Sequence, residues 1–216
     1  MGKTAFLFSG QGSQYIGMGK ELFKNFSSCR EVYKIANEVL NIDMEKLCFE
    51  GNLEDLNKTE NTQPAILTTS IAALTTLQKE GINPDVTAGL SLGEYSSLVC
   101  AGVLSFSSAV KLVRKRGKFM QETVPLGKGK MLAILGLKDH VVELICQKAS
   151  SEGIVEPANY NYPGQIVIGG EVKAVDLAGE MAKKEGAKKV IPLRVSAPFH
   201  TSLLRPASDK LAQELN

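Results

Sequence analysis

The sequence predicts an α/β protein with a larger body and a smaller inserted subdomain. Three observations support this fold class. Apolar runs of strand length alternate with amphipathic runs of helix length along the 216 residues. A strand, a glycine-flanked serine and a helix follow one another at 86–102. The stretch 128–196 has the order strand, helix, strand, strand, helix, strand.

The N-terminal half of the body begins with a short apolar run at 5–8, which predicts a strand closed by the glycine-rich turn Ser-Gly-Gln-Gly. The stretch 21–40 predicts two short helices with a break between them. The clearest helix follows, because Thr62 can cap it, Pro64 suits its first turn and Gly81 can end it.

The body continues with a predicted strand at 86–90, a turn at Ser91 and a helix from Gly93 to Gly102. Ser105 is a suitable cap for a further helix that runs to about residue 123. These elements place the serine at a sharp strand-to-helix turn.

The stretch 128–196 forms the predicted subdomain. Its βαββαβ order is the ferredoxin-like pattern. Glycines precede it and Ala197-Pro198 follow it, so we expect a body formed by 1–127 and 197–216 that holds the subdomain as an insert. Its strands are expected at "MLAILGL", "IVEPANYN", "QIVIGG" and "KKVIPLRV", and its helices at "DHVVELICQKASSEG" and "EVKAVDLAGEMAKKEGA".

Composition excludes several function classes. The 25 basic and 23 acidic residues leave a net charge of +2, which offers no electrostatic attraction for nucleic acid. No apolar span reaches about 18 residues, and the N-terminal apolar run is too short for a signal peptide, so we expect no membrane segment. Four scattered cysteines without a CxxC pair predict free thiols in a reducing cytoplasm and no metal site.

Ser91 is the candidate nucleophile. Gly-Leu-Ser-Leu-Gly between a strand and a helix is the pattern of a nucleophile elbow, a strained turn that needs small neighbours. The N–H groups at the start of the following helix can stabilise an oxyanion beside the serine. An ordinary turn between a strand and a helix is the alternative interpretation.

The chain has two histidines that can activate such a serine. His140 lies in the first turn of an amphipathic helix, where an exposed structural role is expected. His200 lies in "SAPFH", where Pro198 restrains the chain in a rigid bend. His200 is therefore the candidate base, and a buried, hydrogen-bonded structural histidine is the alternative.

Two further stretches carry candidate ligand contacts. The glycines of "SGQGSQ" free backbone N–H groups, and that of Gln11 can be a second oxyanion donor, unless the stretch is only a tight turn. "VKLVRKRGKFMQ" holds several cations, most of which form a solvated face. Arg116 differs because Gly117 follows it and lets another backbone come close, but the sequence leaves open which cation binds a carboxylate.

Six stretches occur together and in order: "GQGSQ", "GLSLGEYSSLVCAG", "RGKFMQ", "GKGKMLAI", "NYNYPGQIVIGG" and "SAPFH". With them the chain, nearly from end to end, resembles the malonyl-CoA:acyl carrier protein transacylases of bacterial fatty-acid synthesis. The resemblance implies an α/β-hydrolase-like core with a ferredoxin-like insert. It also implies ping-pong transfer of malonyl from coenzyme A to a serine, and then to the phosphopantetheine thiol of acyl carrier protein.

The resemblance assigns roles to particular residues. Ser91 would be acylated and His200 would be its base. The backbone N–H groups of Gln11 and Leu92 would form the oxyanion hole. The substrate contacts would be Arg116 for the malonyl carboxylate, Met120 and Phe199 for the acyl pocket, and Asn161 nearby.

The expected partners are acyl carrier protein, bound transiently, and a coenzyme A thioester. We expect no cofactor beyond the substrates and a monomer. Two departures from the family stand out. Leu90 occupies the position that is often histidine, and the chain stops within a predicted helix, so we expect a missing C-terminal segment.

Competing functions follow from the same motifs. A serine hydrolase or thioesterase shares the elbow but has no need of Arg116. An acyltransferase domain of a polyketide synthase shares most motifs but comes with flanking domains. The third alternative is an inactive truncated fragment that only docks carrier protein.

Overall fold

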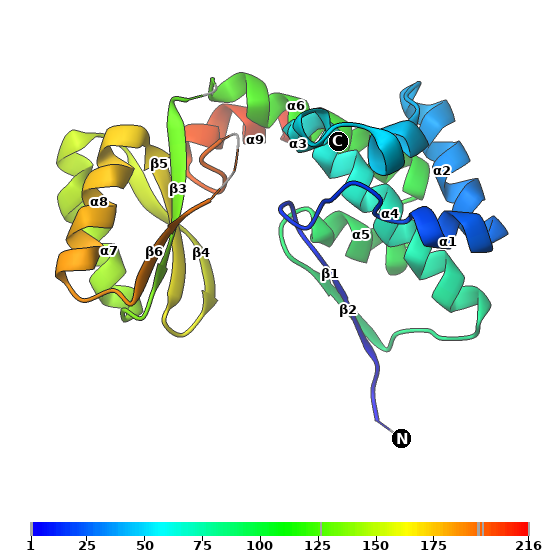
Figure 1. The fold of residues 1–216 in the computed structure, drawn as a ribbon, viewed down its shortest axis with the longest axis horizontal. Coiled ribbons are helices and arrows are strands. Elements are labelled where there is room, and N and C mark those ends of the chain that lie inside the picture. Colours follow the sequence, from blue (N-terminus) through cyan, green and yellow to red (C-terminus); the bar gives the residue numbers. More distant parts are fainter. Residues whose placement is uncertain (1, 126, 194, 196, 216) are drawn as a thin grey trace. The chain divides into compact units, whose positions relative to one another are not determined.

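The computed structural model describes residues 2–125, 127–193, 195 and 197–215. The chain forms two compact units, Met1–Lys118 and Phe119–Asn216, and the division falls within helix α6 (Phe106–Thr123). Mixed α/β structure is present, as the sequence predicts (Figure 1).

The first unit contains a parallel pair of strands, β1 (Ala5–Phe8) and β2 (Val86–Gly89), with Phe8 opposite Gly89 at their common end. Helices make up most of the rest of this unit (Figure 1). They are α1 (Lys20–Asn25), α2 (Ser27–Leu40), a π-helical turn (Lys46–Glu50), α3 (Leu53–Asn57), α4 (Thr59–Lys79), α5 (Gly93–Cys100) and the first part of α6.

Helix α4 is the central element of the first unit. It packs against α2, α3 and α5, and α5 in turn packs on both strands. The inner side chains of α4, among them Leu67 and Ile71, are buried in one apolar core with Tyr33 of α2 and Val113 of α6. This packing fixes the positions from which β2, α5 and α6 contribute to the site.

The predicted start of this helix is wrong by four residues, because the cap is Lys58 and not Thr62. Helix α4 begins at Thr59, with Lys58 as its N-cap and no capping side chain. Thr62 therefore lies inside the helix, where its hydroxyl donates hydrogen bonds to the carbonyl oxygens of Leu56 (2.6 Å) and Lys58 (3.1 Å). Pro64 also lies inside and cannot donate to the carbonyl oxygen of Glu60, four residues earlier.

The second unit contains an antiparallel sheet in the order β4-β5-β3-β6. Its elements follow the predicted βαββαβ order, and this strand order is the ferredoxin-like one. They are β3 (Gly129–Leu135), α7 (Asp139–Ala149), β4 (Val155–Tyr162), β5 (Gln165–Glu171), α8 (Val172–Lys184) and β6 (Lys189–Pro192), with a 3-10 turn at Ser150–Glu152.

Both faces of this sheet are covered. Strand β3 sends Leu132 and Ile134 toward α7 and α8, which lie together on one face (Figure 1). It sends Met131 and Ala133 to the opposite face, as the two-residue period of a strand requires. The second face is covered by apolar residues from the end of α6 and from the segment 197–207, including Phe199.

The segment after the sheet forms a 3-10 turn at Ser202–Leu204 and helix α9 (Arg205–Leu215). Ser196, the predicted last residue of the insert, lies outside the described residues. The predicted assignment of 197–216 to the body of the first unit stays a prediction. No helix in the described part of the chain is long and apolar enough to cross a membrane.

Candidate active site

Ser91 lies in a sharp turn between β2 and α5. Its φ of 52° is left-handed, a conformation that is uncommon for residues other than glycine. A β-carbon on Gly89 would lie 2.0 Å from the carbonyl carbon of Gly93, and one on Gly93 would lie 2.2 Å from the carbonyl oxygen of Phe8. Both flanking glycines are therefore required sterically, which supports the elbow interpretation over an ordinary turn.

The glycine-rich turn after β1 packs against this elbow. The N–H of Leu90 donates a hydrogen bond of 3.1 Å to the carbonyl oxygen of Phe8. A β-carbon on Gly10 would lie 2.7 Å from the carbonyl oxygen of Leu90. Gln11 follows directly, half-buried, and its side-chain amide donates to the hydroxyl of Thr59 at 3.2 Å. The parallel pairing of β1 and β2 thus brings both loops to the same edge.

Leu92 is the N-cap of α5 and is fully buried. The backbone bonds of the turn run from the N–H of Gly93 to Leu90 (2.9 Å) and from the N–H of Glu94 to Ser91 (3.2 Å). The N–H of Leu92 comes before both of them at the start of the helix, and its role as an oxyanion donor stays a prediction.

Arg116 contacts the candidate nucleophile directly. It lies on α6 with 8% of its surface exposed. Its Nη2 donates a hydrogen bond to Oγ of Ser91 at 3.1 Å, and its Nη1 donates to Oε1 of Gln63 at 2.8 Å. The guanidinium carbon lies 5.5 Å from the ring centroid of Tyr95. Burial lowers the pKa of Arg116 and raises that of Tyr95, but a guanidinium stays charged at neutral pH.

Gly117 explains how α6 brings Arg116 to this position. A β-carbon at Gly117 would lie 2.6 Å from the carbonyl oxygen of Thr59 and 2.8 Å from the α-carbon of Glu60. Only glycine lets α6 and the start of α4 approach this closely. The sequence-based expectation that Gly117 permits a close backbone contact is confirmed.

Arg114 is not part of the solvated face that the sequence predicts. It is half-buried, and its Nη1 donates to the carbonyl oxygen of Glu60 at 2.8 Å and also to Oδ1 of Asn61. The carbonyl of Glu60 is the one that Pro64 leaves without a helical donor, so Arg114 supplies the missing hydrogen bond. The neighbouring Lys111 is exposed, as predicted.

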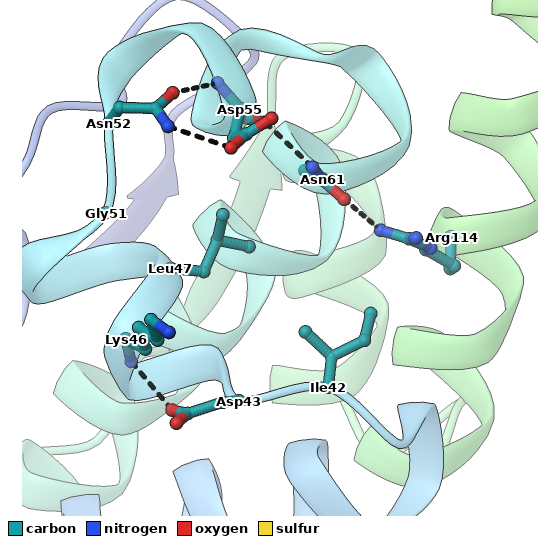
Figure 2. A pocket seen from close by; sticks show the side chains of 9 residues that line it. All are labelled: Ile42, Asp43, Lys46, Leu47, Gly51, Asn52, Asp55, Asn61 and Arg114. Carbon is teal, nitrogen blue, oxygen red and sulfur yellow. Dashed lines mark hydrogen bonds between the residues drawn. The ribbon is translucent and has the colours of Figure 1, made fainter.

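A pocket of about 400 Å³ lies beside Arg114 in the first unit. Figure 2 shows its polar rim, in which Asn52 bonds to Asp55, Asn61 to Asp55, and Arg114 to Asn61. Two cations and two carboxylates are among its lining residues, so no net charge attracts an ion of either sign. The lining residues are Ile42, Asp43, Lys46, Leu47, Gly51, Asn52, Asp55, Asn61 and Arg114.

The second unit contains the remaining predicted site residues. His200 has a φ of 60° and is exposed. It follows a tight bend in which the N–H of Phe199 donates to Ala197 at 3.0 Å and the hydroxyl of Thr201 donates to Pro198 at 2.7 Å. The predicted rigid bend is therefore present. His140 is exposed at the start of α7, in agreement with a structural role.

Met120 and Phe199 belong to one apolar cluster of the second unit, with Phe199 buried and Met120 half-buried. Asn161 lies near the end of β4 with its side chain exposed, and its amide donates to Gln165 at 3.2 Å. The structure thus brings Ser91, Gln11, Leu92 and Arg116 together in the first unit. The roles assigned to these four residues and to His200, Met120, Phe199 and Asn161 stay predictions.

Sequence reasoning missed Gln63 and Tyr95, which contact the Arg116 guanidinium in the part of the chain that the structure describes. A signal for Gln63 exists, because it precedes Leu67 by four residues and so continues the buried stripe of α4 with a polar side chain. Tyr95 carries no such signal, since an aromatic residue in a helix is ordinary. Among the described residues, no group of His, Cys, Asp and Glu could hold a metal ion.

Comparison with known proteins gives consistent matches. The profile of the acyl transferase domain family matches residues 5–216. The chain is 54% identical over 217 residues to the malonyl CoA-acyl carrier protein transacylase of Bacillus subtilis (strain 168), covering 100% of the chain and 68% of that relative. Identity to the transacylase of the same name from Escherichia coli (strain K12) is 48% over 216 residues, which is 100% of the chain and 70% of that protein.

Solved structures of transacylases also match this chain. The crystal structure of a malonyl CoA-acyl carrier protein transacylase from Clostridium perfringens has a TM-score of 0.95 at 55% identity, over 100% of the chain and 68% of that protein. A malonyl-transacylase in complex with its type II PKS acyl-carrier protein has a TM-score of 0.96 at 46% identity, over 99% of the chain and 70% of that protein. The predicted fold class is confirmed by this likeness.

Proposed function

The chain belongs to the acyl transferase domain family, among its malonyl CoA-acyl carrier protein transacylases, and from this premise we propose that it transfers a malonyl group from coenzyme A to acyl carrier protein. One observation supports the proposed site above all others. A buried guanidinium donates a hydrogen bond of 3.1 Å to the hydroxyl of a serine in a nucleophile elbow. This arrangement suits an acyl group that ends in a carboxylate.

The first half-reaction acylates Ser91. Its Oγ attacks the thioester carbonyl of malonyl-CoA, while His200 accepts the hydroxyl proton as general base. The N–H groups of Gln11 and Leu92 stabilise the oxyanion of the tetrahedral intermediate. The carbon–sulfur bond then breaks, His200 returns the proton to the sulfur, and coenzyme A leaves as the free thiol.

The second half-reaction reverses these steps with a different thiol. The phosphopantetheine thiol of acyl carrier protein gives its proton to His200 and attacks the ester carbonyl of malonyl-Ser91. The ester bond breaks, the serine oxygen takes back the proton, and malonyl leaves on the carrier. Each half-reaction exchanges one acyl bond for another, so no oxidant, metal or further cofactor is required.

Arg116 binds the free carboxylate of the malonyl group. A carboxylate is costly to bury without a partner, and a planar guanidinium pairs with it in a bidentate manner. The hydrogen bonds to Ser91 and Gln63 use two of the five N–H groups of the side chain. Met120 and Phe199 line the acyl pocket, and Asn161 contributes to substrate binding near it.

The expected partners and location complete the proposal. A transacylase similar to this chain has been solved with its acyl-carrier protein, and we propose a transient complex of the same kind with a monomeric enzyme. We propose a cytoplasmic location because four scattered cysteines are typical of reducing compartments. The body is proposed to comprise 1–127 and 197–216, with 128–196 as its insert.

The experiment that tests the proposal follows both products. The protein is mixed with malonyl-CoA and phosphopantetheinylated acyl carrier protein, and malonyl-carrier and free malonate are quantified together. We expect malonyl-carrier as the main product. Free malonate as the main product would identify a hydrolase, and no malonyl-carrier with an unmodified serine would identify a non-catalytic protein.

A further inference from the structure

Gln63 is a polar side chain in a fully buried position. It lies on α4 with 0% of its surface exposed. Its Oε1 accepts a hydrogen bond of 2.8 Å from Nη1 of Arg116. A buried amide is retained against its desolvation cost only where it has partners, so this contact holds both side chains in place.

Tyr95 supports the same guanidinium from a different element. It lies in the first turn of α5, shortly after Ser91, and its half-buried ring has its centroid 5.5 Å from the guanidinium carbon. A cation within about 6 Å of an aromatic ring is attracted by the electrons of the ring face. Gln63 and Tyr95 thus restrain Arg116 from α4 and α5, while Nη2 contacts Ser91.

We propose that Gln63 and Tyr95 are positioning residues that hold the Arg116 guanidinium ready for a carboxylate and thereby set the preference for malonyl over acetyl groups. The proposal rests on the proposed function of Arg116. An arginine that is free to move loses rotamer freedom when it binds a ligand, whereas a restrained one has already lost it. Without the two contacts, the free energy of binding between the carboxylate and Arg116 is less favourable.

The chemistry of Gln63 matters as much as its position. The amide oxygen is a neutral acceptor, so it fixes Nη1 and leaves the full positive charge of Arg116 for the substrate. A glutamate of the same shape would pair with the guanidinium and neutralise it. The structure therefore favours glutamine over glutamate at this position for a site that must attract a carboxylate.

The test compares acylation of the protein by malonyl-CoA and by acetyl-CoA, with rates of acyl-protein formation measured by intact mass. Gln63→Met keeps the size and removes the acceptor, and Gln63→Glu keeps the shape and adds charge. We expect both to lower the malonyl-to-acetyl ratio of kcat/KM about tenfold, as loss of one hydrogen bond to a charged group predicts. Tyr95→Leu should lower the ratio, and Tyr95→Phe, which keeps the ring but loses the hydroxyl that interacts with Arg116, should lower it less.

A matched control lies on the same two helices. Asn61 accepts from Arg114 as Gln63 accepts from Arg116, but Arg114 contacts the start of α4 instead of the serine (Figure 2). Asn61→Ala should reduce thermal stability without a change in the malonyl-to-acetyl ratio. Equal shifts of the ratio in Asn61→Ala and Gln63→Met would overturn the proposal, because the effect would then be general loosening of the helix pair.

A double variant separates this proposal from the proposed function. In the Arg116→Ala background, Gln63→Met should leave the ratio unchanged, because Gln63 acts through Arg116. If Arg116→Ala changes the ratio and the Gln63 and Tyr95 variants do not, the positioning role is wrong and the carboxylate role of Arg116 stands. If Arg116→Ala itself keeps the ratio, the proposed function of Arg116 is wrong. The Tyr95 pair supplies the same test if the Gln63 variants fail to fold.

Discussion

The side chain of Arg116 donates a hydrogen bond of 3.1 Å from Nη2 to Oγ of Ser91, so a buried cation and the candidate nucleophile are in direct contact. The two residues come from α6 and from the turn before α5. A carboxylate bound by Arg116 would therefore lie within a few bonds of the reacting serine. A malonyl group has that spacing between its carboxylate and its thioester carbonyl.

The first prediction concerns acyl preference. Arg116→Ala should lower acylation by malonyl-CoA relative to acetyl-CoA about tenfold or more, because the buried carboxylate loses its charged partner. Arg116→Lys should fall between wild type and alanine, since an ammonium offers no planar fork. Competition between the two thioesters, read out by intact mass, measures the ratio. An unchanged ratio in Arg116→Ala would place the carboxylate partner elsewhere.

The second prediction concerns the base. His200→Ala should slow acylation of Ser91 by about a hundredfold or more, the usual cost of losing a general base. His140→Ala is the control, because that residue is exposed on α7 and should react at nearly the wild-type rate. Acylation reactions of both variants are stopped at set times, and the fraction of acylated protein, measured by intact mass, gives the rate of each variant. Equal losses in the two variants would contradict the choice of His200.

The third prediction concerns the shape of the elbow. Gly93→Ala should destabilise the fold by about 1–3 kcal/mol, as overpacking does, and slow acylation. The reason is that the new β-carbon would lie 2.2 Å from the carbonyl oxygen of Phe8. Gly81→Ala serves as the control, since its left-handed backbone has nothing within 4 Å of the new carbon. Gly81→Ala should lower the stability somewhat and leave acylation unchanged. Full acylation by Gly93→Ala would show that the elbow tolerates a larger side chain at this position.

The fourth prediction concerns Arg114. Arg114→Ala should lower the free energy of unfolding by about 1–3 kcal/mol, because the carbonyl of Glu60 loses the donor that replaces the absent N–H of Pro64. The malonyl-to-acetyl ratio should not change. Lys111→Ala, on the exposed side of α6, should shift stability by no more than about 0.5 kcal/mol. Urea unfolding of both variants checks this, and equal stabilities would contradict a structural role for Arg114.

Local patterns explain what the sequence could predict. The demand for glycine at position 89 arises within the elbow itself, where Gly89 meets Gly93, so the five-residue pattern indicates the turn. The demand at position 93 comes from Phe8 on β1 and is visible only in the structure. The ferredoxin-like unit is indicated by the order of its strands and helices and by the spacing of apolar residues in each of them. Both can be read from the sequence. The strand order β4-β5-β3-β6 within the sheet comes from the structure.

Contacts between segments that are distant along the chain explain what the sequence could not predict. Arg114 and Arg116 lie in the same charged run, and only the packing of α6 on α4 directs one to Glu60 and the other to Ser91. Gln63 and Tyr95 become relevant only once α4 and α5 are placed around Arg116. The start of α4 was missed because no capping side chain marks it. The contacts of the two arginines with Glu60, Ser91, Gln63 and Tyr95 are tertiary, whereas the start of α4 lacks a local signal.

The central claim is that Ser91 carries the malonyl group, and one measurement tests it most directly. The protein is incubated with malonyl-CoA, its intact mass is recorded, and the modified peptide is sequenced by fragmentation; Ser91→Ala is treated in parallel. We predict a single malonyl adduct on the peptide that contains Ser91 and no adduct on the variant. An adduct on another residue, or the same adduct on Ser91→Ala, would contradict the account.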